Sequence, residues 1–317
     1  MRVIFMGTPD FAVPVLEAII QAGHTVIGVY TQPDKPKGRG KSMQYTPVKE
    51  KALEHQIPVY QPARVREPEV IEEIRNLKPD IIIVVAFGQI LPEELLAIPP
   101  YGCVNVHASL LPKYRGAAPI QRVIMDGEKE SGVTTMYMAK GLDTGDMIEQ
   151  LVVPIDEKET GGSYHDKLAE AGAGLCISTM EKIEAGTAPR IPQDDTKSCY
   201  AHMLKKSMGE LDFGQPAEVL ERLVRGLNPW PSAYTQLQGK NLKIYEADVV
   251  EIPENQQREP GMITAVDKKS FTIQCNPGGL RIMQLQLEGK KRMNTDAFLL
   301  GFTVEEGMQC GRQQTQK

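Results

Sequence analysis

The feature that most constrains the fold is a run of β-branched residues within positions 80–85, which read Asp-Ile-Ile-Ile-Val-Val. A strand that is apolar on both faces is typical of the interior of a parallel sheet, where helices cover both sides. Strand-like and helix-like runs alternate around it through the first half of the chain. This alternation predicts an α/β domain with a Rossmann-like, mostly parallel sheet.

The elements of this domain follow from hydrophobic periodicity. Strands are expected at residues 2–6, 25–30, 80–85, 102–106, 133–138 and 148–155. Helices are expected at residues 11–22, 47–55, 67–77 and 163–185. Because ligands on such sheets bind at the carboxyl ends of the strands, the loops that follow the strands are where chemistry is expected.

The second half of the chain has a different pattern, with short β runs separated by turn signals after a predicted helix at residues 216–227. Its strands are expected at residues 233–237, 242–250, 261–266, 270–275 and 280–287. This spacing predicts a small OB-like β-barrel. We therefore predict the α/β domain at residues 1–188, a linker at 189–211, the barrel at 212–308 and a frayed polar tail at 309–317.

Charge and hydropathy bear on whether the chain binds nucleic acid, spans a membrane or is secreted. The net charge of −5 is unusual for a nucleic-acid binder, but residues 206–317 hold as many basic as acidic residues, so the acidic excess lies in the first part. No apolar run approaches the roughly 20 residues of a membrane span, and the first apolar run is too short for a secretion signal. We expect a cytoplasmic protein, a monomer, with no membrane partner.

The five cysteines are far apart and form no Cys-x-x-Cys pair, which argues against a disulfide framework and a zinc-thiolate site. We expect all five to be small apolar filler. The histidines other than His107 have no companions at metal-ligand spacing, so no metal is expected.

Two nucleotide-binding motifs are incomplete in this sequence. The first strand-to-helix turn, Gly7-Thr8-Pro9-Asp10-Phe11, lacks the glycine pattern of dinucleotide-binding enzymes. Gly40-Lys41-Ser42 resembles the end of a phosphate-binding loop, but Lys35 stands where the first glycine is required. Neither a nicotinamide cofactor nor nucleotide hydrolysis is expected.

The segment Asn105-Val106-His107 carries the first candidate chemistry. Side chains alternate along a strand, so Asn105 and His107 point to one side, near the strand's end. An amide can donate to an oxyanion, and an imidazole can stabilise the oxyanion or move a proton near neutral pH. The spacing alone fits equally well two polar residues that hydrogen-bond near a strand end.

A carboxylate could hold the imidazole and receive a proton. The loop at residues 141–146 offers Asp143 and Asp146, and its glycines permit the tight turns that would present one of them. The residues themselves do not decide between the two.

Together these motifs make the chain resemble the folate-dependent formyltransferase family. The resemblance rests on Asn105-x-His107 and on five longer runs, at residues 7–11, 31–34, 106–120, 228–231 and 289–293, and on Leu142-Asp143-x-Gly145-Asp146. It covers nearly the whole chain. It implies an enzyme that transfers the formyl group of 10-formyltetrahydrofolate to the α-amino group of methionyl initiator tRNA, for translation initiation.

The resemblance also implies roles for residues. Asn105, His107 and Asp143 would be the catalytic trio, with Asp143 preferred to Asp146 on this ground. The folate would be contacted by the run that follows His107 and by the loop after residues 80–85. These residues are Ser109, Leu110, Leu111, Pro112, Phe87, Gly88, Gln89 and Ile90.

Two basic segments are candidate tRNA contacts. Lys35, Lys37, Arg39 and Lys41 lie in a Gly- and Pro-rich stretch that is expected to be a mobile, non-helical loop, and Lys290, Lys291 and Arg292 form a second patch. Such charge runs are usually solvated surface. The resemblance implies that the first reaches the acceptor stem and the second the tRNA backbone, where cations contact phosphates.

Two alternatives stay open. A sugar or nucleotide amine formyltransferase would keep the trio without needing the basic loop. A non-catalytic tRNA-binding or folate-binding module would leave Asn105, His107 and Asp143 far apart.

Overall fold

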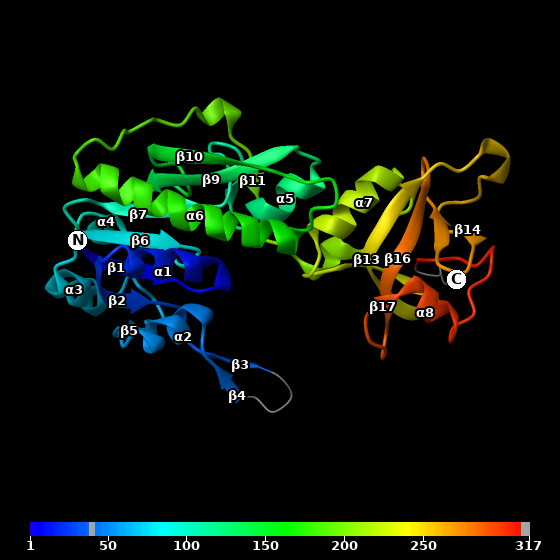
Figure 1. Ribbon diagram of the computed structural model, residues 1–317, viewed down its shortest axis with the longest axis horizontal. Helices are drawn as coiled ribbons and strands as arrows, with labels where there is room; N and C mark the ends of the chain where they lie inside the picture. The colour runs from blue at the N-terminus through cyan, green and yellow to red at the C-terminus, as the bar shows by residue number, and fades with distance from the viewer. Residues whose placement is uncertain (38–41, 312–317) are drawn as a thin grey trace. The chain divides into compact units, whose positions relative to one another are not determined.

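The structure is a computed structural model that describes residues 1–37 and 42–311 (Figure 1). Of Lys37 and Ser42 it describes only the backbone. The chain forms two compact units, each assembled from several segments. The first unit consists of Met1–Pro119, Glu130–Pro154 and His165–Ala201. The second consists of Ile120–Lys129, Ile155–Tyr164 and the residues from His202 onward.

The first unit is built on a seven-stranded sheet. In spatial order its strands are β10 (Met147–Pro154), β9 (Glu130–Tyr137), β7 (Cys103–His107), β6 (Ile81–Val85), β1 (Arg2–Gly7), β2 (Thr25–Tyr30) and β5 (Val59–Tyr60). The five from β7 to β5 are parallel, whereas β9 and β10 are antiparallel to their neighbours. The predicted Rossmann-like, mostly parallel sheet is confirmed.

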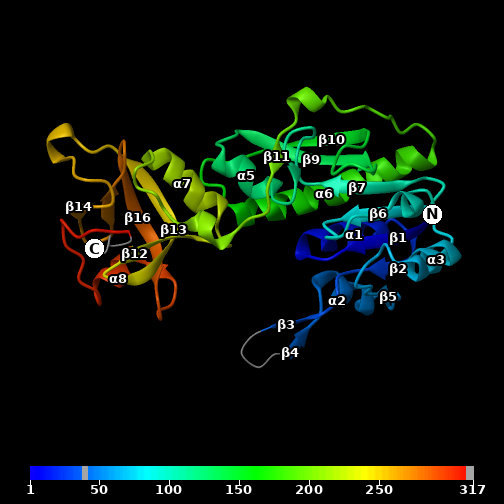
Figure 2. The same cartoon turned by 180° about the vertical axis from the view of Figure 1, so that it is seen from behind.

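Helices cover both faces of this sheet (Figures 1 and 2). They are α1 (Val13–Gln21), α2 (Pro47–Glu54), α3 (Pro68–Leu77), α4 (Glu93–Leu96) and α6 (Gly161–Glu184). Ile74 of α3 and Leu95 of α4 pack on Ile82 and Val84. On the other face α6 approaches β7 closely, because a Cβ on Gly172 would lie 3.2 Å from the Cγ1 atom of Val106. All five residues of β6 are buried as a result.

Several short elements of the first unit differ from the prediction. The helix expected at residues 11–22 begins with a 3-10 turn, η1 (Asp10–Ala12), before α1. Residues 35–41 were expected to be a non-helical loop. The first three of them form strand β3 (Lys35–Lys37), which pairs antiparallel with β4 (Ser42–Gln44). Proline at position 36 is tolerated there because an isolated two-stranded ribbon has free edges. Strand β5 and helix α4 were not predicted.

The second unit contains a six-stranded antiparallel sheet after α7 (Ala217–Gly226). Its strands are β12 (Ala233–Leu237), β13 (Lys240–Val250), β16 (Gly279–Leu287), β15 (Phe271–Gln274) and β14 (Ile263–Val266) in spatial order, with β17 (Met293–Asn294) on β16. Residues beyond the sheet connect its two edges, since Cys310 pairs with Leu237 of β12 and Gln309 pairs with Met262 next to β14. The predicted small barrel is therefore present.

This closure corrects the prediction of a frayed tail for its first residues, 309–311. Cys310 is buried, and its N–H donates to the carbonyl of Gly261 at 2.8 Å. The polar composition of the tail concealed one small apolar side chain that the core takes up. Residues 312–317 lie outside the described part of the chain.

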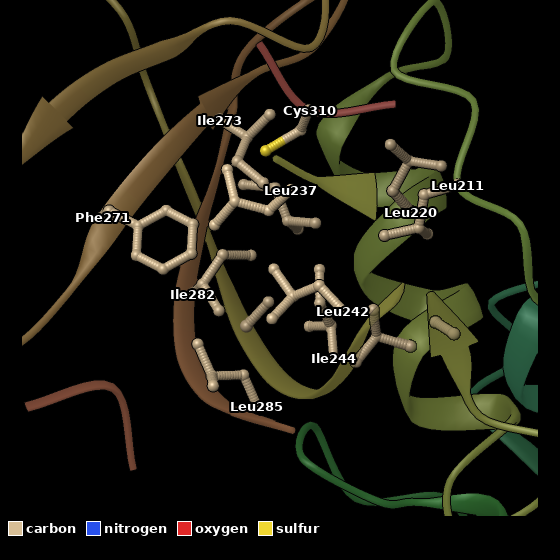
Figure 3. Close-up of a cluster of buried hydrophobic side chains, with 14 of the residues drawn as sticks. Leu211, Leu220, Leu237, Leu242, Ile244, Phe271, Ile273, Ile282, Leu285 and Cys310 are labelled. Atoms are coloured by element: carbon tan, nitrogen blue, oxygen red, sulfur yellow. The ribbon is translucent and has the colours of Figure 1, made fainter. Parts of the chain in front are cut away.

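The barrel encloses the core of the second unit (Figure 3). Leu237, Leu242, Phe271 and Ile282 point from the strands toward one another, and Leu220 of α7 closes one side. Helix α8 (Thr295–Leu299), which was not predicted, adds Phe298 to the same core.

Two segments that precede residue 202 complete the second unit. Helix α5 (Pro119–Met125) supplies one, and Arg222 of α7 donates to the carbonyl of its Met125 at 3.3 Å. In the other, Lys158 pairs with Asp248 of β13 at 2.7 Å. Short 3-10 turns η3 (Lys206–Gly209) and η4 (Glu254–Gln256) lie in the connections. Within residues 1–37 and 42–311, none of the helices combines the length and apolar character that a membrane span requires.

Candidate active site

The three residues of the expected trio lie together in the first unit. Asn105 and His107 occupy the carboxyl end of β7, between β6 and β9, and are only 9% and 7% exposed. Asp143 lies in the loop between β9 and β10. The Nδ1 atom of His107 is 3.8 Å from the Oδ2 atom of Asp143, and Asn105 donates from Nδ2 to Oδ1 of Asp143 at 3.4 Å.

A tight turn presents Asp143. Its φ of 52° lies in the left-handed region, which side chains with a Cβ rarely adopt. Two residues later, a Cβ on Gly145 would lie 1.7 Å from the carbonyl oxygen of Tyr137, so only glycine fits. The backbone N–H of Gly116 donates to Oδ2 of Asp143 at 2.8 Å. Both carboxylate oxygens are thus held by N–H groups, while Asp146 pairs instead with Arg190 at 3.6 Å.

A backbone carbonyl fixes the orientation of the imidazole. The Nε2 atom of His107 lies 3.0 Å from the carbonyl oxygen of Tyr114. A carbonyl can only accept, so Nε2 carries the hydrogen, and Nδ1 is left facing Asp143. The imidazole is therefore set with its second nitrogen toward the carboxylate.

The segment after His107 is held by side chains of the two antiparallel strands. Thr134 of β9 donates to the carbonyl of Ser109 at 2.7 Å and accepts from the N–H of Leu111 at 3.1 Å. Gln150 of β10 donates to the carbonyl of Leu111 at 2.8 Å. The hydroxyl of Ser109 is buried and donates to the carbonyl of Lys113 at 2.7 Å. Of the predicted folate contacts in this run, Leu110 and Pro112 keep accessible surface, whereas Ser109 and Leu111 are buried.

The loop after β6 holds the other predicted folate contacts. Phe87 is a core residue, and its carbonyl accepts from Thr8 and Gln32 at 3.0 and 3.1 Å. The side chain of Gln89 accepts from the N–H of Val65 at 2.6 Å, so it anchors a neighbouring loop. Gly88 has a φ of 85°, and Ile90 is 79% exposed. Backbone groups and Ile90 are therefore what this loop can offer a ligand.

The basic candidates are exposed where the structure describes them. Lys35 is exposed on β3, and Lys37 is described by its backbone alone. Arg39 and Lys41 lie outside the described residues. Lys290 and Lys291 are exposed after β16, while the guanidinium of Arg292 lies 4.2 Å from the centre of the Tyr245 ring. Arg292 is also exposed, so its charge remains accessible at the surface.

Sequence reasoning missed residues that support the trio. Gln193 donates from Nε2 to the carbonyls of Asp143 and Gly145, both at 2.8 Å. It lies in the stretch predicted as a linker, where no periodicity or motif singled it out. Cys199 also departs from the prediction that all cysteines are filler, because it is exposed and its Sγ accepts from the N–H of Tyr114 at 3.2 Å. The other four cysteines are buried.

The side chains of this site fit the needs of acyl transfer. An amide N–H, an imidazole and a carboxylate converge on one strand end, where they can stabilise an oxyanion and move a proton. Among the described residues, no cluster of three or more His, Cys, Asp or Glu side chains could hold a metal ion.

Comparison with protein families agrees with this arrangement. Residues 1–180 match the family described as formyl transferase, and residues 203–303 match the formyl transferase C-terminal domain. The first match contains all three residues of the trio.

Curated relatives match almost end to end. The methionyl-tRNA formyltransferase of Lachnospira eligens is 55% identical over 314 residues, which cover 98% of this chain and 100% of that protein. The methionyl-tRNA formyltransferase of Agathobacter rectalis is 56% identical over 307 residues, which cover 97% of this chain and 98% of that protein.

A solved structure shares the fold. The N-formyltransferase from Helicobacter canadensis, in complex with folinic acid and dTDP-3-aminofucose, superposes with a TM-score of 0.68 at 20% identity, over 89% of this chain and 98% of that one. The resemblance to folate-dependent formyltransferases is confirmed by the family matches and the curated relatives together. The chain therefore belongs to the formyl transferase family, within the group of the methionyl-tRNA formyltransferases.

Proposed function

We propose that this protein transfers the formyl group of 10-formyltetrahydrofolate to the α-amino group of methionyl initiator tRNA, for translation initiation. The observation that carries the proposal is the convergence of Asn105, His107 and Asp143 at the end of β7. Relatives with more than half of their residues identical, matched over nearly their whole length, carry the name of that activity.

Asn105 would stabilise the charge that develops on the formyl oxygen. When the amine attacks the formyl carbon, the carbonyl oxygen becomes negative. The amide nitrogen of Asn105 has two N–H groups, and one of them is directed at Asp143. The other can point toward the oxyanion and donate to it. Such a hydrogen bond is stronger in a buried site than in water.

His107 and Asp143 would move the proton. As the bond between the amine nitrogen and the formyl carbon forms, that nitrogen becomes positively charged and acidic. Nδ1 of His107 carries no hydrogen in the neutral ring and, with the nearby carboxylate of Asp143, can take the proton. The same proton then passes to the N10 nitrogen as its bond to the formyl carbon breaks. Proton and charge balance over the reaction.

The folate would lie against the loops that flank the trio. Leu110, Pro112 and Ile90 offer accessible apolar surface, and the peptide groups of Gly88 and Gln89, with the N–H of Phe87, can meet the donors and acceptors of a pterin ring. Ser109 and Leu111 would act by holding this wall in place, because both are buried.

The tRNA would be bound by the two basic segments. In this proposal residues 1–188 carry out the chemistry, residues 212–308 bind tRNA, and residues 189–211 connect them. Lys290, Lys291 and Arg292 would contact the phosphate backbone, and Lys35, Lys37, Arg39 and Lys41 the acceptor stem. The proposal includes a cytoplasmic monomer.

The experiment that tests the proposal measures formyl transfer from 10-formyltetrahydrofolate to charged methionyl initiator tRNA at low and high salt, beside an amino-sugar nucleotide. Formylated tRNA, with kcat/KM that falls steeply with salt, would support the chemistry and the phosphate contacts. If only the sugar nucleotide is formylated, the trio survives and the tRNA is the wrong acceptor. If neither is formylated, the catalytic proposal fails.

A further inference from the structure

Residues 190–201, here called the strap, lie along the first unit and join two loops of the candidate site. At one end, Ile191 pairs with Met147 through two backbone hydrogen bonds of 2.9 and 3.0 Å. The guanidinium of Arg190 stacks on the ring of Tyr137, 3.8 Å from its centre. The strap is therefore fixed to both strands from which the Asp143 loop emerges.

The other end of the strap holds the loop that follows Pro112. Its strand β11 (Tyr200–Ala201) pairs in parallel with β8 (Arg115–Gly116). The N–H groups of Arg115 and Ala117 donate to the carbonyls of Cys199 and Ala201, at 3.0 and 2.9 Å. This loop contains Tyr114, whose carbonyl orients His107, and Gly116, whose N–H holds Asp143.

Gln193 is the residue of the strap that reaches the trio's own loop. Its Oε1 accepts from Nε and Nη2 of Arg115, at 3.0 and 2.8 Å, and its Nε2 donates to the carbonyls of Asp143 and Gly145, both at 2.8 Å. A guanidinium only donates and a carbonyl only accepts, so the amide has a single orientation that satisfies all four contacts. One side chain thus ties the Asp143 loop to Arg115, the neighbour of Gly116.

The backbone on both sides of this tie is in an unfavourable conformation. Asp143 has a φ of 52° and Tyr114 a φ of 58°. Non-glycine residues keep such angles only where their surroundings hold them. Gln193 holds the first through the carbonyl of Asp143 itself, and Cys199 contacts the N–H of Tyr114.

We propose that Gln193 is a positioning residue of the transfer reaction, which sets the Asp143 carboxylate against Asn105 and His107. This inference rests on the proposed function of the trio. Gln193 acts on the backbone behind Asp143 and touches no reacting atom. Its loss lowers kcat through the geometry of Asp143, while the KM values for folate and tRNA stay near those of the wild type.

Two substitutions separate this role from bulk packing. Gln193→Glu keeps the size and the oxygen that faces Arg115, but it places a second oxygen against two carbonyls. Gln193→Ala removes every contact. Both variants should lower kcat by about 10- to 100-fold, the scale expected when a catalytic group is displaced by about 1 Å. Thr196→Ala is the matched control in the strap, since the hydroxyl of Thr196 donates only to Asp194.

The deciding measurement is a double-mutant cycle with Asp143→Asn. If Gln193 acts through Asp143, the double variant is no slower than Asp143→Asn alone. The proposal would be overturned if the rate loss of the double variant were the product of the two single losses. A wild-type kcat in both Gln193 variants would overturn it as well. A structural readout makes the test independent of activity. The imidazole NMR signals of His107 should shift in Gln193→Ala and stay in place in Thr196→Ala, and unchanged signals in both would also overturn it. A wild-type protein that formylates no tRNA, with shifted His107 signals, would instead mark the failure of the proposed function alone.

Discussion

The Nε2 atom of His107 donates to the backbone carbonyl of Tyr114 at 3.0 Å, which leaves Nδ1 as the nitrogen that faces Asp143. The tautomer of the imidazole is therefore set by a peptide group that no side-chain substitution removes. Substitutions at Asn105 or Asp143 should therefore leave the hydrogen bond at Nε2 of His107 in place.

We expect Asn105→Ala, His107→Ala and Asp143→Ala each to lower kcat by about 10²–10⁴-fold, because each removes an oxyanion donor or a proton-transfer group. Single-turnover formylation measures the effect, and circular dichroism checks folding. Asp166→Ala, which removes an exposed carboxylate from α6, is the control. A near-normal kcat in any of the three would remove that residue from the trio.

Two glycines of α6 provide a matched pair for stability. Gly174→Ala should raise the free energy of unfolding by about 0.5–1 kcal/mol, since alanine favours the helix and nothing lies within 4 Å of the new Cβ. Gly172→Ala has the same helical gain, but its Cβ would lie 3.2 Å from Val106, beside His107. We expect it to be less stable than Gly174→Ala in urea denaturation. Equal stability of the two variants would show that the packing of α6 on β7 yields easily.

The second basic segment can be tested with two pairs of variants that change the net charge equally. Lys290→Gln with Lys291→Gln should raise KM for tRNA and reduce the salt dependence of kcat/KM, because two phosphate contacts are lost. Lys268→Gln with Lys269→Gln removes the same charge from another exposed turn of the second unit. If both pairs behave alike, the effect is one of net charge and the assigned surface is wrong.

The stability of the second unit should depend on pH through Asp248. Hydrogen bonds from Lys158 and Arg281, at 2.7 and 2.9 Å, hold the pKa of Asp248 below its usual 3.8. Because this pKa is lower in the folded than in the unfolded protein, the ionised carboxylate stabilises the fold at pH values above the unfolded-state pKa. This contribution is lost as the pH falls through the folded-state pKa. Asp248→Asn should therefore cost about 0.5–1 kcal/mol of unfolding free energy at pH 7, since the pair is partly exposed.

The difference between Asp248→Asn and the wild type should shrink below pH 3.8 and vanish below the folded pKa. Urea titrations across this range measure it. Glu246→Gln, which removes an exposed carboxylate from the same strand, is the control. A difference that persists at the lowest pH would assign the loss to packing.

Thiol reactivity should single out Cys199. Burial raises the pKa of the thiols of Cys103, Cys176, Cys275 and Cys310 to about 12, so they form little thiolate and are shielded from reagents. We expect a disulfide reagent to modify one thiol of the native protein quickly and the rest only after unfolding. Cys199→Ser should abolish the fast phase. Rapid reaction of a second thiol would contradict the buried positions.

Periodicity in the sequence predicted the long elements and failed on the short ones. Strand β2 was predicted at the residues where it occurs, because its six residues form a mostly β-branched run that is long enough to recognise in the sequence. Strand β5 has two residues and α4 has four, which is too short for any period to appear. Their positions depend on the neighbours they pair with or pack on.

The site could be predicted in part for similar reasons. Alternation along β7 indicated that Asn105 and His107 share a face, and the strand confirms this. The choice of Asp143 over Asp146 came from family resemblance, because spacing carries no information about which loop residue turns inward. Gln193 and the pairing of Cys310 with Leu237 could not be predicted, since both are contacts between distant segments without a local pattern.

Two segments, Ile120–Lys129 and Ile155–Tyr164, belong to the second unit although the chain around them belongs to the first. This division limits how hybrids with relatives can be made. Gly161 lies so close to Gly226 that an added Cβ would be 2.4 Å from its carbonyl oxygen, and Arg225 donates to the carbonyl of Glu159 at 2.9 Å. A single crossover at residue 202 would take the two sides of these contacts from different parents. A hybrid that preserves them has to inherit Ile120–Lys129, Ile155–Tyr164 and the part from His202 onward from one parent, so recombination here has three linked exchange blocks.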